Sequence, residues 1–161
     1  MHRKSSWVGA AALALLLPLQ AQATLFNYTI GLSGANEVNG GDPDGFGTAQ
    51  ITIDDSTAPF PTISWNITVG NLALPPTGAH IHQGVAGVNG PVRIDFSAQL
   101  TGSGLQDSDL VGVIAQPSGW YVNIHTSQFP GGAIRGQVPE PATALLLAGG
   151  LALLARRRAG A

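Results

Sequence analysis

Two histidines with a spacing suited to one face of a strand are the clearest candidates for chemistry in this sequence. His80 and His82 lie two residues apart in the run 78–83, which we predict to be a β-strand. Side chains alternate between the two faces of a strand, so both imidazoles project from the same face, about 6.6 Å apart along the backbone. Ala79 and Ile81 then point the other way, toward the core.

A third histidine, His125, ends a second predicted strand. Val122 and Ile124 point to one face of that strand, and Tyr121 and Asn123 share the other face with His125. Three neutral imidazoles that converge would suit zinc with a fourth ligand or water, or Cu(II) in a tetragonal nitrogen set. Convergence requires the two strands to meet in space, which sequence spacing does not show. The alternative is a trio of surface or hydrogen-bonded histidines without metal.

The elements that position these histidines are all predicted to be strands. Short runs of β-branched and aromatic residues alternate with Gly, Pro, Asn and Asp, and between residues 24 and 138 we predict no helix. Eight short strands in one domain of this size predict an all-β sandwich or barrel. The predicted strands are residues 26–32, 47–53, 62–69, 78–83, 92–98, 110–115, 120–126 and 133–138.

Charge and cysteine content limit the function of this domain. Residues 24–138 contain two basic side chains, Arg93 and Arg135, against eight acidic ones, a formal charge of minus six. Such a surface repels phosphate backbones, so we expect no nucleic-acid partner. The chain has no cysteine. Its stability must therefore come from a packed core or a bound ion rather than from disulfides.

Other conspicuous side chains have a structural interpretation that we favour. Trp65, Trp120 and Tyr121 are expected to pack in the core or a cleft rather than to form a carbohydrate platform. Asp42 and Asp44 could form half of a calcium loop, but the later glutamate that closes such a loop is missing. The sequence also shows no phosphate loop, no paired catalytic carboxylates and no Ser, His and acid order typical of hydrolases.

The first 23 residues have the pattern of a cleaved secretory signal peptide. Basic side chains at 2–4 precede an apolar run at 8–19, and the small residues Ala21 and Ala23 mark a cleavage site before Thr24. The apolar run is too short to span a bilayer about 30 Å thick. We therefore predict cleavage by signal peptidase, with an uncleaved N-terminal anchor as the alternative.

The last residues, 139–161, have a different pattern. An uncharged stretch at 142–155 is about 21 Å long as a helix, so it would serve as a short, strained transmembrane helix with the arginines on the cytoplasmic side. The tail resembles a PEP-CTERM sorting signal, which implies recognition and cutting by an exosortase at the cell envelope. The alternative is an ordinary C-terminal anchor. The residues that carry this resemblance are Pro139, Glu140, Pro141, Arg156, Arg157 and Arg158.

The domain between these ends resembles a CHRD domain. The resemblance lies in Gly-Ala-His-Ile-His-Gln-Gly at 78–84, Tyr-Val-Asn-Ile-His-Thr at 121–126 and the glycine-rich segment 129–137. The segments 32–38 and 45–51 fit the start of that domain as well. CHRD domains occur in exported proteins and have no agreed biochemical activity.

CHRD domains are also similar in outline to copper/zinc superoxide dismutase, an eight-stranded Greek-key β-barrel. That resemblance implies a copper site on His80, His82 and His125, with Arg135 as an anion-guiding residue. In a purely structural interpretation, Arg135 pairs with Asp95 or another carboxylate. No histidine lies between His82 and His125 to bridge a second metal. A complete dinuclear dismutase site is therefore excluded, and a mononuclear three-histidine site remains.

Two functions from different classes follow. We favour an exported cell-envelope or extracellular-matrix protein with a non-enzymatic CHRD binding module, processed by exosortase, whose partners could include exopolysaccharide or other matrix components. It would be membrane-anchored through the C-terminal helix until processing and then remain at the surface or be released. The alternative is a mononuclear copper or zinc protein with weak dismutase-like redox activity.

Overall fold

The computed structural model describes residues 24–140, which form an all-β domain with one short α-helix and two short 3-10 turns. The predicted signal peptide with Ala21 and Ala23, Pro141, the predicted transmembrane helix 142–155 and the arginines at 156–158 lie outside these residues. Within the described part of the chain, no helix has the length and apolarity needed to cross a membrane. The elements are β1 Leu25–Ser33, β2 Phe46–Asp54, β3 Thr62–Gly70, β4 Gly78–Gln83, β5 Val92–Asp95, β6 Thr101–Gln106, α1 Leu110–Ala115, β7 Trp120–His125 and β8 Ile134–Gln137.

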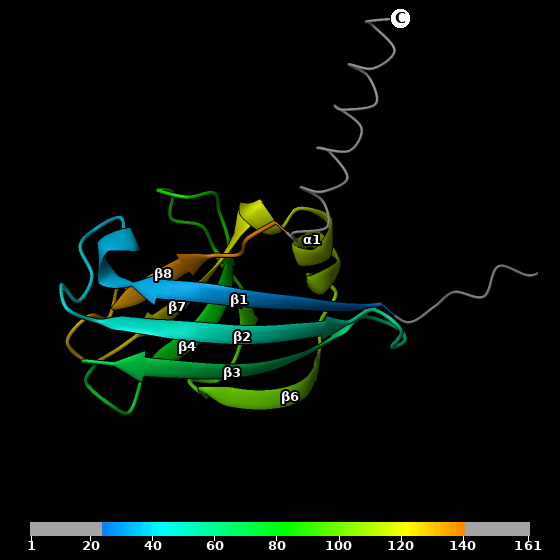
Figure 1. The fold of residues 1–161 in the computed structure, drawn as a ribbon, viewed down its shortest axis with the longest axis horizontal. Coiled ribbons are helices and arrows are strands. Elements are labelled where there is room, and N and C mark those ends of the chain that lie inside the picture. The colour runs from blue at the N-terminus through cyan, green and yellow to red at the C-terminus, as the bar shows by residue number, and fades with distance from the viewer. Residues whose placement is uncertain (1–23, 141–161) are drawn as a thin grey trace, which may run out of the picture.

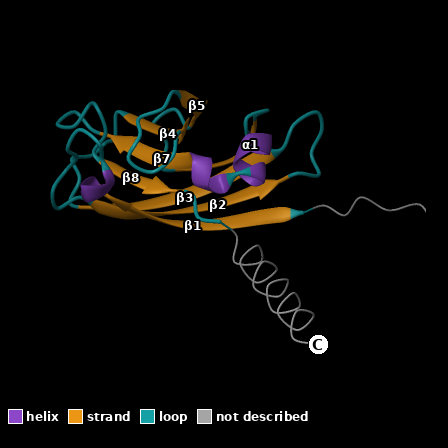
Figure 2. Ribbon diagram, turned by 90° about the horizontal axis from the view of Figure 1, so that it is seen from above, coloured by secondary structure: helices purple, strands orange, loops and turns teal. Residues whose placement is uncertain are grey.

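The eight strands form one antiparallel sheet in the order β5-β4-β7-β8-β1-β2-β3-β6. This sheet curls into a half-barrel (Figure 1), and the strand order places β5 and β6 at its edges. Figure 2 shows β4, β5 and β7 in one layer and β1, β2 and β3 in the other. The first and last strands, β1 and β8, are the central pair, joined at Ser33 and Arg135.

The hydrophobic core lies between the two layers and follows from strand alternation. On β4, Ala79 and Ile81 are fully buried, and on β7 so are Val122 and Ile124, as the sequence predicted. Burying one isoleucine side chain contributes about 1.5–3 kcal/mol. The matching side chains from the opposite layer are Tyr28, Ile30, Leu32, Ala49, Ile51, Ile53, Ile63 and Ile67.

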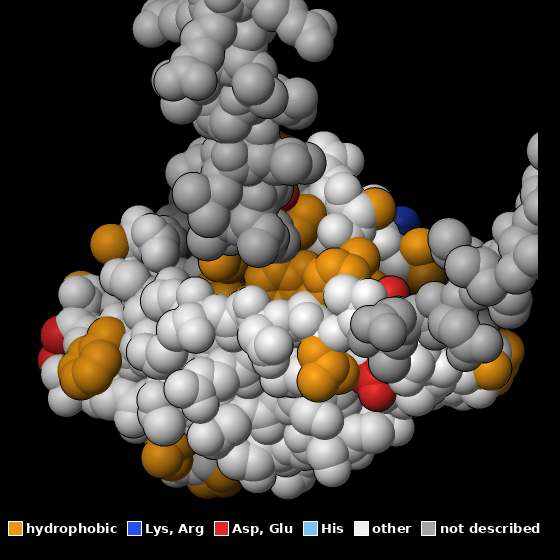
Figure 3. Space-filling model, turned by 45° about the vertical axis from the view of Figure 1, so that its right-hand side comes forward, with side chains coloured by type: hydrophobic (Ala, Val, Ile, Leu, Met, Phe, Trp, Pro, Cys, Tyr) orange, Lys and Arg blue, Asp and Glu red, His pale blue; other side chains and the backbone are white. Residues whose placement is uncertain are grey.

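The outer surface matches the low charge content of the sequence. In the view of Figure 3, most of the described surface is backbone and uncharged polar side chains, hydrophobic side chains gather near the centre and lie singly elsewhere, and few charged groups are visible. This surface offers no broad basic patch in that view.

Seven of the eight predicted strands correspond to strands in the structure. One predicted strand is a helix, and one observed strand was not predicted. Residues 110–115 form α1 rather than a strand, and in α1 Leu110 and Val113 are buried at helical spacing while Val111 is exposed. The missed strand is β6, which lies between the predicted strands 92–98 and 110–115 and contains two glycines. A side chain at Gly102 would overlap the Trp65 ring, so this strand needs glycine to pack against β3.

Candidate metal centre

The three histidines meet because β4 and β7 are neighbouring antiparallel strands. In this pairing His80 lies opposite Asn123, His82 opposite Tyr121, and His125 opposite Gly78. A Cβ atom at Gly78 would lie only 2.7 Å from Cε1 of His80 and 3.3 Å from Cδ2 of His125. Glycine at this position therefore leaves the space that two of the imidazoles occupy.

The rings are close enough to share one ion. Their centroids are 5.6 Å apart for His80 and His82, 5.1 Å for His80 and His125, and 6.1 Å for His82 and His125. One ring nitrogen from each histidine lies within 4.8 Å of the other two. Two nitrogens on one metal can be at most about 4.2 Å apart, because each metal–nitrogen bond is about 2.0–2.1 Å long. Small side-chain rotations would complete the coordination.

Backbone carbonyls fix the orientation of two of the rings. Nδ1 of His82 lies 2.9 Å from the Gly90 carbonyl oxygen, and Nδ1 of His125 lies 2.9 Å from the Pro130 carbonyl oxygen. A carbonyl can only accept, so Nδ1 carries the proton and Nε2 keeps its lone pair in each neutral ring. Both Nε2 atoms are buried and have no hydrogen-bond partner in the described structure.

In His80 the roles of the two ring nitrogens are reversed, because Nε2 rather than Nδ1 faces a protein oxygen. Its Nε2 lies 3.5 Å from Oδ1 of Asp95, and its Nδ1 is buried without a hydrogen-bond partner among residues 24–140. The three ring nitrogens without a hydrogen-bond partner are thus Nδ1 of His80, Nε2 of His82 and Nε2 of His125. Metal-ligating histidines usually donate their second nitrogen to a carboxylate or a carbonyl. His82 and His125 do so to carbonyls, and the second nitrogen of His80 lies near the Asp95 carboxylate at 3.5 Å.

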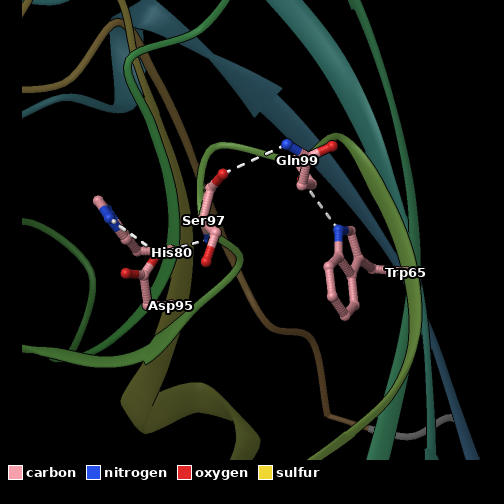
Figure 4. Close-up of polar contacts among 5 residues, drawn as sticks. All are labelled: Trp65, His80, Asp95, Ser97 and Gln99. Atoms are coloured by element: carbon pink, nitrogen blue, oxygen red, sulfur yellow. Dashed lines mark hydrogen bonds and ion pairs between the residues drawn. The ribbon is translucent and has the colours of Figure 1, made fainter.

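Asp95 is itself positioned by the loop after β5 (Figure 4). The Ser97 amide donates to Oδ1 of Asp95 at 2.7 Å, and the Gln99 side chain reaches the Ser97 carbonyl at 3.5 Å. The Trp65 indole nitrogen then donates to the Gln99 carbonyl at 2.9 Å. Polar contacts therefore connect the histidine cluster to β3 in the opposite layer.

The environment keeps two of the imidazoles neutral. Burial lowers the pKa of His80, and the nearby His125 lowers it further, against the opposing effect of Asp95. Burial also lowers the pKa of His82, and His80, His125 and Arg135 add to this against the Gly90 hydrogen bond. A neutral imidazole is the form that binds a metal ion.

Arg135 is buried beside the cluster rather than exposed. Its guanidinium carbon lies 3.3 Å from the centre of the Tyr121 ring, and its nitrogens donate to three groups of the loop 84–91. These acceptors are Oδ1 of Asn89 at 3.2 Å and the carbonyls of Val85 at 3.0 Å and Val88 at 2.8 Å. The structural interpretation paired Arg135 with Asp95 or another carboxylate. Among residues 24–140 Asp95 lies beside His80 instead, and the guanidinium hydrogen-bonds the Asn89 side chain and two carbonyls. The anion-guiding role of Arg135 stays a prediction.

The sequence placed the histidines on a non-core face, and loops cover that face in part, so that His82 is buried while His80 and His125 are partly exposed. The loops 84–91 and 126–133 contact it, and His82 is only 7% exposed and Tyr121 only 1%. His82 is therefore a buried residue rather than a surface one. The alternation that placed Asn123 on this face could have marked it as part of the cluster, because its side-chain oxygen is also buried and unpaired.

The remaining sequence candidates lie elsewhere. Trp65 stacks on Phe96 with centroids 4.2 Å apart, and Trp120 is buried, so their packing interpretation is confirmed. Among residues 24–140, the histidine trio is the one group of three or more side chains suited to a metal, and Asp42 and Asp44 do not belong to it. In the described part of the sorting motif, Glu140 accepts from the Ser118 amide at 3.3 Å.

Comparisons with known proteins agree with both resemblances. Residues 28–138 match the model of the CHRD domain, and residues 137–159 match that of the PEP-CTERM protein-sorting motif. No curated protein and no solved structure matches the chain. The likeness to superoxide dismutase therefore has no support from a solved structure.

Proposed function

Because the chain belongs to the CHRD domain family, we propose that it is an exported, envelope-sorted protein whose CHRD domain binds one copper or zinc ion through His80, His82 and His125. The main support is the set of three imidazole nitrogens that are buried, unpaired and within 4.8 Å of one another. An unpaired buried nitrogen costs free energy, commonly about 1–3 kcal/mol, unless a ligand satisfies it. A single metal ion would satisfy all three.

The donor set favours a borderline transition metal over a hard cation. Imidazole suits zinc and copper, whereas calcium and magnesium require oxygen ligands. Three protein ligands leave at least one position for another ligand, as in catalytic rather than closed structural sites. Among the described residues, Asp95 is the carboxylate next to the trio. It lies beside His80 and would orient that ring rather than bind the ion itself.

Sorting forms the second part of the proposal. The PEP-CTERM motif implies recognition by an exosortase. We expect signal peptidase to remove residues 1–23, the tail to hold the protein at the membrane, and exosortase to trim it near Pro139 to Pro141. The metal-binding domain would then act at the cell surface or in the matrix, where exopolysaccharide is a candidate partner. If protein from a host with an intact exosortase still carries Arg156 to Arg158 by mass spectrometry, this processing is wrong.

Titration calorimetry of the full-length chain with Cu(II) and Zn(II) tests the metal proposal. We expect about one ion per chain, and loss of uptake in the double variant His80→Ala, His82→Ala. The matched control is Gln50→Ala, which removes an exposed polar side chain on β2 and should bind as the wild type does. No heat with the wild type, or equal uptake by the double variant, would contradict the proposal.

A further inference from the structure

A fourth unpaired group lies on the same face as the three histidines. Asn123 is 3% exposed, and its side-chain oxygen has no hydrogen-bond partner in the described structure. Asn123 lies directly opposite His80 in the β4–β7 pairing and directly opposite Arg135 in the β7–β8 pairing. Opposed side chains in such pairs have Cβ atoms about 4.5–5.5 Å apart, so the carboxamide is within reach of the imidazole.

A buried carboxamide without a partner is unusual in a folded protein. Buried polar side chains are hydrogen-bonded in the large majority of cases, and an exception calls for a ligand, water or ion. Four of the unpaired buried atoms in the described chain belong to this one face, namely those of Asn123 and the three histidines. A metal ion can satisfy the three imidazole nitrogens, and a small acceptor bound to that ion can pair with Asn123 once the carboxamide is turned so that its NH2, rather than its oxygen, faces the site.

The electrostatics of the face favour an anion as that group. A divalent ion on three neutral imidazoles leaves a net positive charge, and the buried Arg135, directly opposite Asn123 in the β7–β8 pairing, adds a further positive charge. The one carboxylate in contact with the trio, Asp95, is engaged with His80. A carboxamide can turn its NH2 toward the site and donate to such an anion.

We propose that Asn123 hydrogen-bonds a small monodentate anion held at the open coordination position of the metal on His80, His82 and His125. This inference rests on the metal site proposed above. Asn123 is then a binding residue for the exogenous ligand and not a ligand of the metal. The anion lies between the ion and the carboxamide, on the covered face of the sheet.

Azide binding to the Cu(II)-loaded full-length chain tests this, followed by the azide-to-copper absorption band. Asn123→Leu keeps the side-chain shape and removes the hydrogen bond. We expect its Cu(II) affinity to stay within about threefold of the wild type and its azide affinity to fall about tenfold or more. The control Asn66→Leu, at an exposed position on β3, should match the wild type in both.

A second readout separates this role from a structural one. Removing an unpaired buried carboxamide should leave the melting temperature of the metal-free protein unchanged or higher. A lower melting temperature for Asn123→Leu together with an unchanged azide affinity would mark a structural role and overturn the inference. Should the leucine variant fail to fold, Asn123→Asp keeps the shape but loses the donor, and we expect it to retain copper and bind azide more weakly.

The outcomes distinguish the two proposals. Equal azide affinity in the wild type and Asn123→Leu, with copper bound in both, overturns the role of Asn123 and leaves the metal site intact. Loss of Cu(II) binding in Asn123→Leu, with the fold preserved, makes Asn123 a ligand of the metal and also overturns the inference. Absence of Cu(II) uptake by the wild type rejects the metal site, and with it the anion position.

Discussion

The imidazole of His82 lies flat against the phenol ring of Tyr121, with centroids 4.8 Å apart and ring planes at 11°. The same phenol hydroxyl accepts a hydrogen bond from the Gly90 amide at 3.1 Å, and the Gly90 carbonyl holds Nδ1 of His82. Tyr121 therefore supports His82 both through its ring and through the loop. A residue that orients a ligand in this way should influence metal affinity without touching the ion.

We expect Tyr121→Leu to weaken Cu(II) or Zn(II) binding by about tenfold or more, since changes in such supporting contacts commonly cost 10–100-fold. Tyr121→Phe keeps the stacking and loses only the contact with Gly90, so its effect should be smaller. Calorimetric titration of both variants measures this. Equal affinity for the wild type and Tyr121→Leu would show that the stacking does not position His82.

Arg135→Ala should destabilise the domain by about 2–4 kcal/mol, because three loop acceptors lose a charged donor and a buried space opens beside Tyr121. Urea denaturation measures the free energy of unfolding. Arg93→Ala, at an exposed position of β5, is the matched control and should change it by less than about 0.5 kcal/mol. Similar values for the two variants would contradict the buried role of Arg135.

Gly78→Ala should reduce metal affinity because its Cβ would meet the rings of His80 and His125 at 2.7 and 3.3 Å. We expect a loss of about tenfold or more, since the two rings must turn away from their shared position. Gly31→Ala on β1 is the control, because nothing lies within 4 Å of a Cβ there. Metal titration of the two variants decides the point, and an unaffected Gly78→Ala would mean that the rings adapt freely.

The metal-free protein should lose stability as the pH falls below about 6.5, the ordinary pKa of histidine. The lowered pKa values of His80 and His82 mean that the unfolded chain takes up protons at a higher pH than the folded one. Their contribution is therefore complete above the unfolded pKa and is lost as the pH falls through the folded values. Asp95 opposes this shift at His80, and His125 and Arg135 reinforce it at His82.

The melting temperature measured between about pH 4.5 and 8 checks this pH dependence. In the variant His80→Asn, His82→Asn the slope near pH 6 should be shallower than in the wild type. Parallel curves for the two proteins would show that these histidines do not carry the effect.

Cleavage of the signal peptide before Thr24 would create a new charge contact. The Thr24 nitrogen donates to Oδ1 of Asp55 at 2.9 Å, and the Asp55 amide donates to the Thr24 carbonyl at 3.3 Å. After cleavage that nitrogen would be an ammonium group beside a carboxylate. We expect mass spectrometry of the exported protein to show Thr24 as its first residue, and a mature chain that begins at Met1 would contradict this.

The sequence predicted which strand faces carry the histidines better than it predicted the groups that surround them. Strand alternation alone placed His80 and His82 on the outer face of one strand and His125 on the outer face of another, and the pairing of β4 with β7 brings the three together. Their supporting groups were not predictable, since the carbonyls of Gly90 and Pro130 come from loops whose paths depend on tertiary packing. An apolar run such as 110–115 is also ambiguous, because β-branched residues occur in buried helices as well as in strands.

The central position of β1 and β8 has a consequence for folding. The half-sheets β5-β4-β7-β8 and β1-β2-β3-β6 are joined where Ser33 meets Arg135, so the first strand pairs with the last one synthesised. Pairing over such a sequence separation is slow, because a long loop must close before any contact forms. The sheet cannot be completed until residue 137 has been made. A chain of this topology therefore stays incompletely folded while it emerges, which is the state that a secretion channel accepts.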